Sequence, residues 1–353
     1  MKYLRPLIGA LLGALFIWLL VRRLDFAELA RSFRQVQYLL IIPALLIALL
    51  GFVARAYRWR YLFSREEDIP FRKLYTATMI GFMGNALLPA RAGEFIRAYV
   101  ISKAKNKLAV SKAFATIVSE RLFDGAVLIL FLCFTLLVLP SDKPVVIPEG
   151  TLFDRSLVLT QAHLFRMAAI ACGVLAIAAG FVFLLYFKGE TIARALGRAT
   201  PAIFQKAAEH LTRLTISFTS GFDIVRDRRR LVTVGLLSIL VWAPAALAVY
   251  PMLHAFPEDI SWPWYTPIVV LTILCVGLMI PAAPGFVGTF HAFCVAALLL
   301  CAPEPISFDS AVAFSVVYHG ATMIALVVVG LICLSVENLS LVEVTRRAQR
   351  SAE

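Results

Sequence analysis

Six long apolar runs constrain this chain more than any other feature of its sequence. Each run is long enough to cross the roughly 30 Å hydrocarbon layer of a bilayer as a helix. The runs are Leu4–Val21, Leu39–Tyr57, Lys112–Leu139, Phe165–Phe187, Leu231–Leu253 and Ala311–Val336. A mean hydropathy of +0.84 and a charged fraction of only 16% exclude a soluble globular domain, in which about 25% of residues are charged. We therefore predict an all-α polytopic integral membrane protein.

Two further apolar segments, 74–103 and 264–301, are interrupted near their middles. The first break has the sequence LLPARAG and the second MIPAAPG, with proline and glycine four residues apart in both. Proline removes a helix hydrogen bond, and glycine permits left-handed or closely packed backbone. Opened backbone survives inside a membrane only where it is buried in protein or lines a wet cavity. We predict two re-entrant helical hairpins, with breaks at Pro89, Gly93, Pro281, Pro284, Gly285 and Gly288.

The order of the segments predicts two repeats in a single membrane domain, residues 1–353. Repeat 1 is 1–139 and repeat 2 is 163–336, and each runs span, span, hairpin, span. Lys and Arg flank the first hairpin but not the second, so the hairpins should enter from opposite sides, as in an inverted-repeat transporter.

The same charge rule predicts cytoplasmic N- and C-termini. Segment 188–230, which is rich in basic residues, is predicted to be a cytoplasmic amphipathic loop. The count treats Arg55, Arg58 and Arg60 as cytoplasmic residues before the first hairpin. Residues 24–36 also carry arginines, on the side predicted to be external, and we interpret them as an interfacial amphipathic helix.

Six charged residues lie in the first hairpin after its break and in the span that follows. Arg91, Glu94 and Arg97 recur every three residues, and Glu120 and Asp124 are four apart with Arg121 beside them. A charge in mid-membrane costs about 2.5–3.5 kcal/mol on insertion scales, so such residues are normally paired or face water. An arginine fork donates two parallel hydrogen bonds to a phosphate. We therefore predict lipid-phosphate binding by the three arginines, positioned by Asn85, Glu94, Glu120 and Asp124. The alternatives are a buried ion-pair lattice that only fixes the hairpin, or a rim of cytoplasmic charges.

The second hairpin brings histidine in place of charge. His291 follows its break and His319 lies in the last span, where the two could meet. A proton-linked role is one interpretation, and hydrogen-bonded packing is the other. The sequence has no catalytic triad order, no metal-ligand spacing and no nucleotide-binding loop, so we expect no enzyme activity, no metal and no cofactor. The net charge of +12 is carried by loops beside the spans and gives no argument for nucleic acid.

Three motifs resemble a known family: NALLPARAGEFIRAY, then SERLFD, then PAAPGFVGT. In this order they are similar to the lysylphosphatidylglycerol synthase transmembrane family, also called flippase-like or UPF0104 proteins. The resemblance covers nearly the whole chain. It implies the membrane half of the multiple peptide resistance factor, which moves aminoacylated phosphatidylglycerol between leaflets, without its soluble synthase domain. The resemblance also implies a multi-pass protein of the bacterial inner (plasma) membrane. The pattern departs from the family at Thr289–His291, where a glutamate is expected, and at Tyr318–His319, where an arginine is expected.

Three functions are compatible with these observations. The first is flipping or scrambling of an anionic or aminoacylated phospholipid, or another lipid-phosphate. The second is a polyprenyl-phosphate-dependent glycosyltransferase or lipid-modifying enzyme, with Glu94 or Asp124 as its acidic residue. The third is an ion-coupled transporter of a small soluble solute. The expected partners are the membrane and a phospholipid or lipid-linked substrate; homo-oligomerisation is left open.

Overall fold

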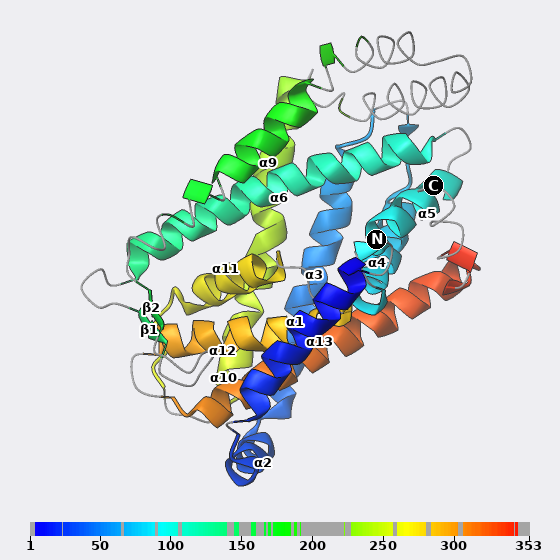
Figure 1. Ribbon diagram of the computed structural model, residues 1–353. Helices are drawn as coiled ribbons and strands as arrows, with labels where there is room; N and C mark the ends of the chain where they lie inside the picture. The colour runs from blue at the N-terminus through cyan, green and yellow to red at the C-terminus, as the bar shows by residue number, and fades with distance from the viewer. Residues whose placement is uncertain are drawn as a thin grey trace.

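The chain forms a bundle of helices in the computed structural model (Figure 1). The structure describes residues 4–22, 24–64, 67–88, 91–104, 108–139, 145–147, 157–159, 166, 169–170, 172–184, 187–188, 191, 222, 227–256, 260–279, 284–302, 306–341 and 343–344. Pro89, Pro281 and most of the predicted loop 188–230 lie outside the described residues.

The described elements are mostly helical. The helices are α1 (Leu4–Val21), α2 (Phe26–Gln35), α3 (Ile41–Arg60), α4 (Phe71–Leu87), α5 (Gly93–Ala104), α6 (Val110–Val138), α9 (Arg228–Leu247), α10 (Val249–His254), α11 (Thr266–Leu278), α12 (Thr289–Cys301) and α13 (Phe308–Val336). Short 3₁₀ turns cover Tyr38–Leu40 (η1) and Pro284–Phe286 (η6). Strand β1 (Val145–Ile147) pairs antiparallel with β2 (Leu157–Leu159).

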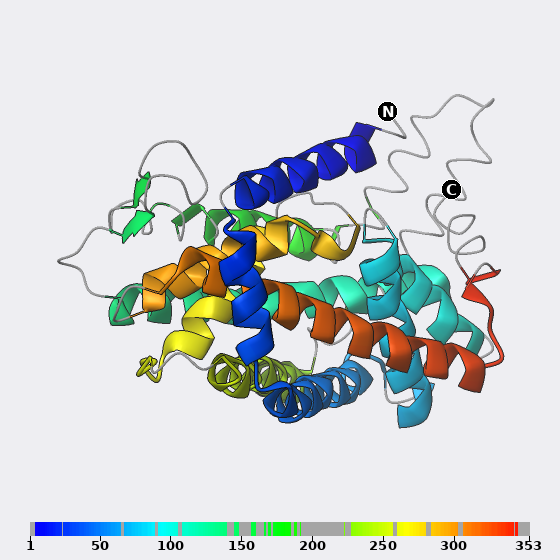
Figure 2. The same ribbon diagram turned by 90° about the horizontal axis from the view of Figure 1, so that it is seen from below.

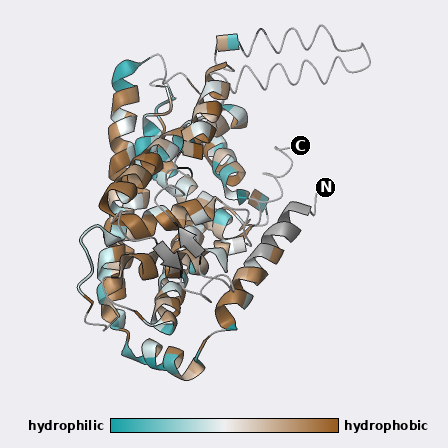
Figure 3. Cartoon of the chain, turned by 60° about the vertical axis from the view of Figure 1, so that its left-hand side comes forward, coloured by the Kyte–Doolittle hydropathy of each residue, from teal (hydrophilic) through white to brown (hydrophobic). Residues whose placement is uncertain are grey.

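Four of the described helical segments are long and apolar enough to cross a membrane. They are Tyr38–Arg60, Val110–Val138, Arg228–His254 and Phe308–Val336. Figure 3 shows hydrophobic residues along most of the helical ribbon. Helix α1 has the bounds of the first predicted span, and an apolar helix at Cys172–Leu184 lies within the fourth. The chain is thus consistent with a multi-pass membrane protein.

Helices α4 and α5 pack so closely that only glycine fits at their crossing. A methyl group added at Gly81 would lie 2.7 Å from Cβ of Arg97, and one at Gly84 would lie 3.0 Å from Cα of Gly93. Gly93 itself faces the backbone oxygen of Gly81. Small residues allow this backbone approach between helices where no hydrophobic force drives association. The segment predicted as the first hairpin is therefore a tightly packed helix pair.

Helices α11 and α12 form the second pair, with η6 between them. Gly285 and Gly288 have φ angles of 68° and 85°, in the left-handed region that glycine adopts without a side-chain clash. Gly288 also faces the backbone oxygen of Gly13, so α1 packs directly against this break.

The two helix pairs begin beside different ends of α6 and α13, which run in opposite directions across the molecule (Figures 1 and 2). Lys73 of α4 pairs with Glu337, just beyond the end of α13, at 2.5 Å. Trp264, just before α11, instead contacts Phe134 near the end of α6, with ring centroids 5.8 Å apart. The tips of both pairs therefore project toward the middle of the bundle.

Candidate functional site

The two breaks touch each other. Nη2 of Arg91, in the first break, donates a hydrogen bond of 2.7 Å to the carbonyl oxygen of Leu278, where α11 ends. The same guanidinium lies 5.9 Å from the ring centroid of Phe286 in η6. A Cβ atom at Gly285 would lie 3.2 Å from the carbonyl oxygen of Ala86 in α4. Segments almost 200 residues apart thus meet through backbone carbonyls and one arginine.

Both breaks contain a non-glycine residue in the left-handed region. Arg91 has a φ of 53° and Phe286 a φ of 59°. Such conformations cost about 1–3 kcal/mol each and persist where the surroundings fix them. Here the Arg91–Leu278 hydrogen bond and the Arg91–Phe286 contact hold the two residues against each other, which marks the junction as a specific structure.

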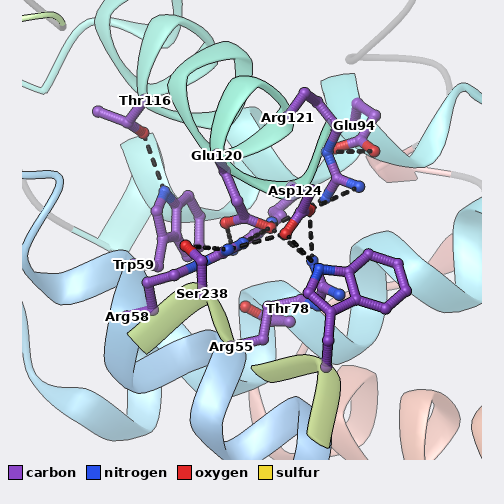
Figure 4. A network of polar contacts seen from close by, with 12 residues as sticks. Arg55, Arg58, Trp59, Thr78, Glu94, Thr116, Glu120, Arg121, Asp124 and Ser238 are labelled. Carbon is purple, nitrogen blue, oxygen red and sulfur yellow. Dashed lines mark hydrogen bonds and ion pairs between the residues drawn. The ribbon is translucent and has the colours of Figure 1, made fainter. Parts of the chain in front are cut away.

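A buried charge network lies beside this junction, on α3, α5 and α6 (Figure 4). Glu120 accepts hydrogen bonds from both terminal nitrogens of Arg97, at 3.0 and 2.9 Å, and from Nη1 of Arg55, at 3.2 Å. Asp124 accepts from Arg58 at 2.8 Å and from Arg55 at 2.9 Å. The spacing explains the geometry, because residues three or four apart share one helix face. Glu120 and Asp124 therefore both point from α6 toward Arg55 and Arg58 on α3.

Helix α9 joins the network from the second half of the chain. Nε1 of Trp242 donates to Asp124 at 3.1 Å, and Nη1 of Arg58 donates to the hydroxyl of Ser238 at 2.8 Å. Arg121 completes the network with bonds to Glu120 at 2.9 Å and Asp124 at 3.3 Å. Polar side chains thus link the two halves of the bundle.

The described network carries more positive than negative charge. Its arginines are Arg55, Arg58, Arg97 and Arg121, and its carboxylates are Glu94, Glu120 and Asp124, so four minus three leaves one positive charge. Glu94 reaches it only through Arg121, at 3.7 Å. An unbalanced buried cation is costly, and a bound anion would neutralise it.

The three arginines predicted to bind phosphate are in different environments. Arg97 is 1% exposed, is held by both oxygens of Glu120, and lies 3.7 Å from the ring centroid of Trp59. The side chain of Arg121 is 36% exposed, and Arg91 is exposed at the junction. Arg91 lies within electrostatic range of Arg121 and of Glu94. Arg97 is thus enclosed, whereas Arg91 and Arg121 are accessible. Of the three arginines predicted to bind phosphate, we therefore keep Arg91 and Arg121 as candidates.

Arg55 and Arg58 are the functional-site residues that the sequence interpretation missed. They were counted among the cytoplasmic charges before the first hairpin, with Arg55 in the last turn of a span ending at Tyr57 and Arg58 just beyond it. The predicted end of that span was wrong, because α3 continues to Arg60 and both arginine side chains are buried. The network supplies the carboxylates that make their burial tolerable. Their i, i+3 spacing, matching the i, i+4 spacing of Glu120 and Asp124, was the available signal.

The remaining predicted residues lie around the two breaks. Asn85 lies beside Gly93, and its buried Oδ1 has no hydrogen-bond partner among the described residues. Nε2 of His319 lies 2.8 Å from the carbonyl oxygen of Gly285 and must carry a proton, because a carbonyl only accepts.

The two histidines are neighbours at the second break. The backbone N–H of Gly288 donates to Nδ1 of His291 at 3.2 Å, which requires that nitrogen to be unprotonated. The ring centroids of His291 and His319 are 4.8 Å apart, and Phe290 stacks on His319 at 4.6 Å. Within the described part of the chain, no group of three metal-ligating side chains comes together.

Comparison with known proteins gives one family over nearly the whole chain. Residues 7–330 match the profile of the lysylphosphatidylglycerol synthase TM region. The chain is 26% identical over 370 residues to the glycosyltransferase AglD of Haloferax volcanii; the match covers 98% of this chain but only 56% of that protein. A UPF0104 membrane protein of Methanothermobacter thermautotrophicus is 24% identical over 274 residues, covering 74% of this chain and 75% of that protein. UPF0104 membrane protein PH1989 of Pyrococcus horikoshii is 26% identical over 142 residues, 38% of this chain and 40% of that protein.

Proposed function

This chain belongs to the lysylphosphatidylglycerol synthase TM region family, as its three motifs predicted, and from that premise we propose that it moves a lipid bearing a phosphate between the leaflets of a bacterial inner membrane. The substrate class is an anionic or aminoacylated phospholipid, or another lipid-phosphate. The observation that carries the proposal is the contact between the two breaks, with Arg91 and Arg121 accessible beside it.

A phosphate fits between these two arginines for electrostatic reasons. Arg91 and Arg121 are close enough to repel each other, and Glu94, which lies 3.7 Å from Arg121, offsets part of that repulsion at Arg91. An anion bound by both guanidinium groups relieves that repulsion and gains charge-assisted hydrogen bonds. Arg97, Glu120, Asp124, Arg55 and Arg58 then act as positioning residues, because their buried ion pairs hold α3, α5 and α6 together behind the site.

Arg91 also provides a mechanism that couples binding to movement. In this structure its Nη2 donates to Leu278, which joins the two tips. A lipid phosphate competes for the same donor, so that substrate binding weakens the contact between the tips. The separated helix pairs then expose the head group alternately to the two sides, while the acyl chains stay in the bilayer.

The orientation we propose is that of two inverted repeats. The end of the bundle where α4 begins and α5 ends carries Lys73, Lys103 and Lys112, and α9 begins there with Arg228–Arg230. Positive residues favour the cytoplasmic side, so this end and both termini are cytoplasmic in our proposal. The α11–α12 pair would then enter from the external side.

The histidine pair provides a proposed energy link. Protonation of His291 at Nδ1 replaces the acceptor of the Gly288 N–H by a donor, which removes the cap at the second break. Protons arriving from one side would thereby alter the tip that contacts Arg91.

Lipid movement is tested in proteoliposomes that contain a fluorescent phospholipid. Arg91→Ala and Arg121→Ala should each slow translocation about 10- to 100-fold, since a hydrogen bond to a charged group contributes about 1.5–3 kcal/mol. Arg72→Ala is the matched control, because it removes an exposed positive charge from the far end of α4. Wild-type rates in folded Arg91→Ala and Arg121→Ala proteins would refute the proposal.

An enzymatic function is the second candidate, because the relative AglD is named as a glycosyltransferase. Against it, both oxygens of Asp124 accept bonds from arginines, and Glu94 faces Arg121, so neither carboxylate is free to act as a base. Turnover of a polyprenyl-phosphate sugar by purified protein alone would favour the enzyme. Solute uptake that needs no particular lipid would instead favour the third candidate, an ion-coupled transporter.

A further inference from the structure

A polar pocket lies at the junction of α3 and α9, away from the contact between the breaks. It has a volume of 370 Å³ and is lined by Arg60, Tyr61, Ser64, Asp68 and Arg230, together with two apolar side chains. Arg60 ends α3, and Arg230 lies in the first turn of α9. The pocket therefore lies between helices from the two halves of the chain, at the end that we propose to be cytoplasmic.

The two arginines of the pocket are only partly engaged. Nη2 of Arg60 lies 3.4 Å from Asp68, whose side chain is 80% exposed, and this long surface pair is easily exchanged. Arg230 donates from Nη1 to the carbonyl oxygen of Phe63 at 2.8 Å, and its Nε lies 3.5 Å from Asp227. Because a guanidinium has five N–H donors, both arginines keep donors for a further acceptor. The pocket can therefore bind an anionic group of phosphate size.

An apolar surface continues from the pocket along α3. Exposed apolar residues of this helix include Leu46, Leu50, Val53 and Tyr57. They precede Arg60 at helical spacing, so they lie on the same face of α3 as this arginine. A ligand with a charged head and long apolar tails matches both the pocket and this face.

We propose that this pocket binds the phosphate of an anionic phospholipid as a resident lipid, separate from the lipid that is transported. Arg60 and Arg230 bind the phosphate, the hydroxyls of Tyr61 and Ser64 complete the polar lining, and the acyl chains lie along the apolar face of α3. Basic pockets between helices on the cytoplasmic side of a membrane are suited to such head groups. A volume of 370 Å³ is within the usual range for a small-molecule site, about 300–1,000 Å³, and suffices for a glycerophosphate head group.

The test compares two double variants that each remove two positive charges. Arg60→Gln/Arg230→Gln changes the pocket, whereas Arg228→Gln/Arg229→Gln changes exposed arginines next to it. Each protein is reconstituted in nanodiscs of phosphatidylcholine with increasing phosphatidylglycerol, and the bound phosphatidylglycerol is counted by native mass spectrometry. The pocket variant should bind at least about 10-fold more weakly, because it loses charge-assisted hydrogen bonds to the phosphate as well as two surface charges. The control variant loses only the two surface charges and should retain more of the affinity. Equal weakening in the two variants would overturn the proposal, because it would reflect surface charge alone.

Further variants and a competing ligand separate specific binding in the pocket from the alternatives. Asp68→Asn removes the carboxylate that competes for Arg60, so binding should tighten about threefold, and unchanged or weaker binding would count against the site. Arg60→Gln alone, which disturbs only an exposed pair, guards against misfolding of the double variant and should also weaken binding. Excess glycerol 3-phosphate should leave the lipid bound; full displacement would assign the pocket to a soluble phosphate compound instead. Arg91→Ala should retain this lipid even if it abolishes transport, which separates the two proposals.

Discussion

Replacing Glu120 by glutamine tests whether the buried network holds the bundle together. Glu120 is 0% exposed and accepts hydrogen bonds from Arg55, Arg97 and Arg121. Glutamine keeps the shape but removes the charge, so the surplus of positive charge rises from one to two. It also turns one oxygen that accepts from Arg97 into an NH₂ donor. Removing one partner of a buried pair costs about 3–5 kcal/mol, and we expect a loss of that size for Glu120→Gln.

The assay is the free energy of unfolding in detergent micelles, measured by steric trapping. Asp68→Asn is the control, because it removes a carboxylate from an exposed pair and should change stability by less than about 1 kcal/mol. Arg97→Met added to Glu120→Gln should recover part of the loss, since it returns the surplus to one charge and removes the unpaired fork. The reasoning is refuted if Glu120→Gln costs less than about 1 kcal/mol, or if the two substitutions add without coupling.

Two other substitutions address the hairpins. Gly93→Ala should destabilise the protein by about 1–3 kcal/mol or more, the cost of an overpacked core, because its methyl group would overlap the backbone oxygen of Gly81. Wild-type thermal stability would contradict the close crossing of α4 and α5. His291→Asn keeps an acceptor for the Gly288 N–H but has no titratable group, so lipid translocation by this variant should lose the acid-side pH dependence that protonation of His291 gives the wild type. Parallel pH profiles for the two proteins, measured in the same proteoliposomes, would remove the proton-linked role.

Much of the fold was predictable because the bilayer imposes simple rules on sequence. The bounds of α1 matched the first apolar run, and the proline–glycine breaks located the ends of α4 and α11 to within a few residues. The burial of Arg55 and Arg58 was not predictable from hydropathy. A charged residue near the end of an apolar run is consistent with either a loop or a buried pair, and only the position of Glu120 and Asp124 on a different helix decides between them.

The candidate site shows the same limit. Helical spacing grouped Arg91 with Arg97, but the backbone turns at Arg91, which precedes the helix that carries Arg97. The two side chains therefore point to different surroundings, one to Leu278 and one to Glu120. Residues three or four apart share a face only within a continuous helix, so a break between them removes the basis for placing them together.

The glycine crossing of α4 and α5 has a consequence for motion. Backbone that touches backbone leaves no flexible side chains to absorb sliding, so this pair should shift as one rigid lever about its open end. Lys73 and Lys103 anchor that end to the region after α13 through Glu337 and Glu343. A small tilt at that end becomes a larger displacement at Arg91. The contact that Arg91 makes, here with Leu278, therefore limits how far the helix pair can tilt.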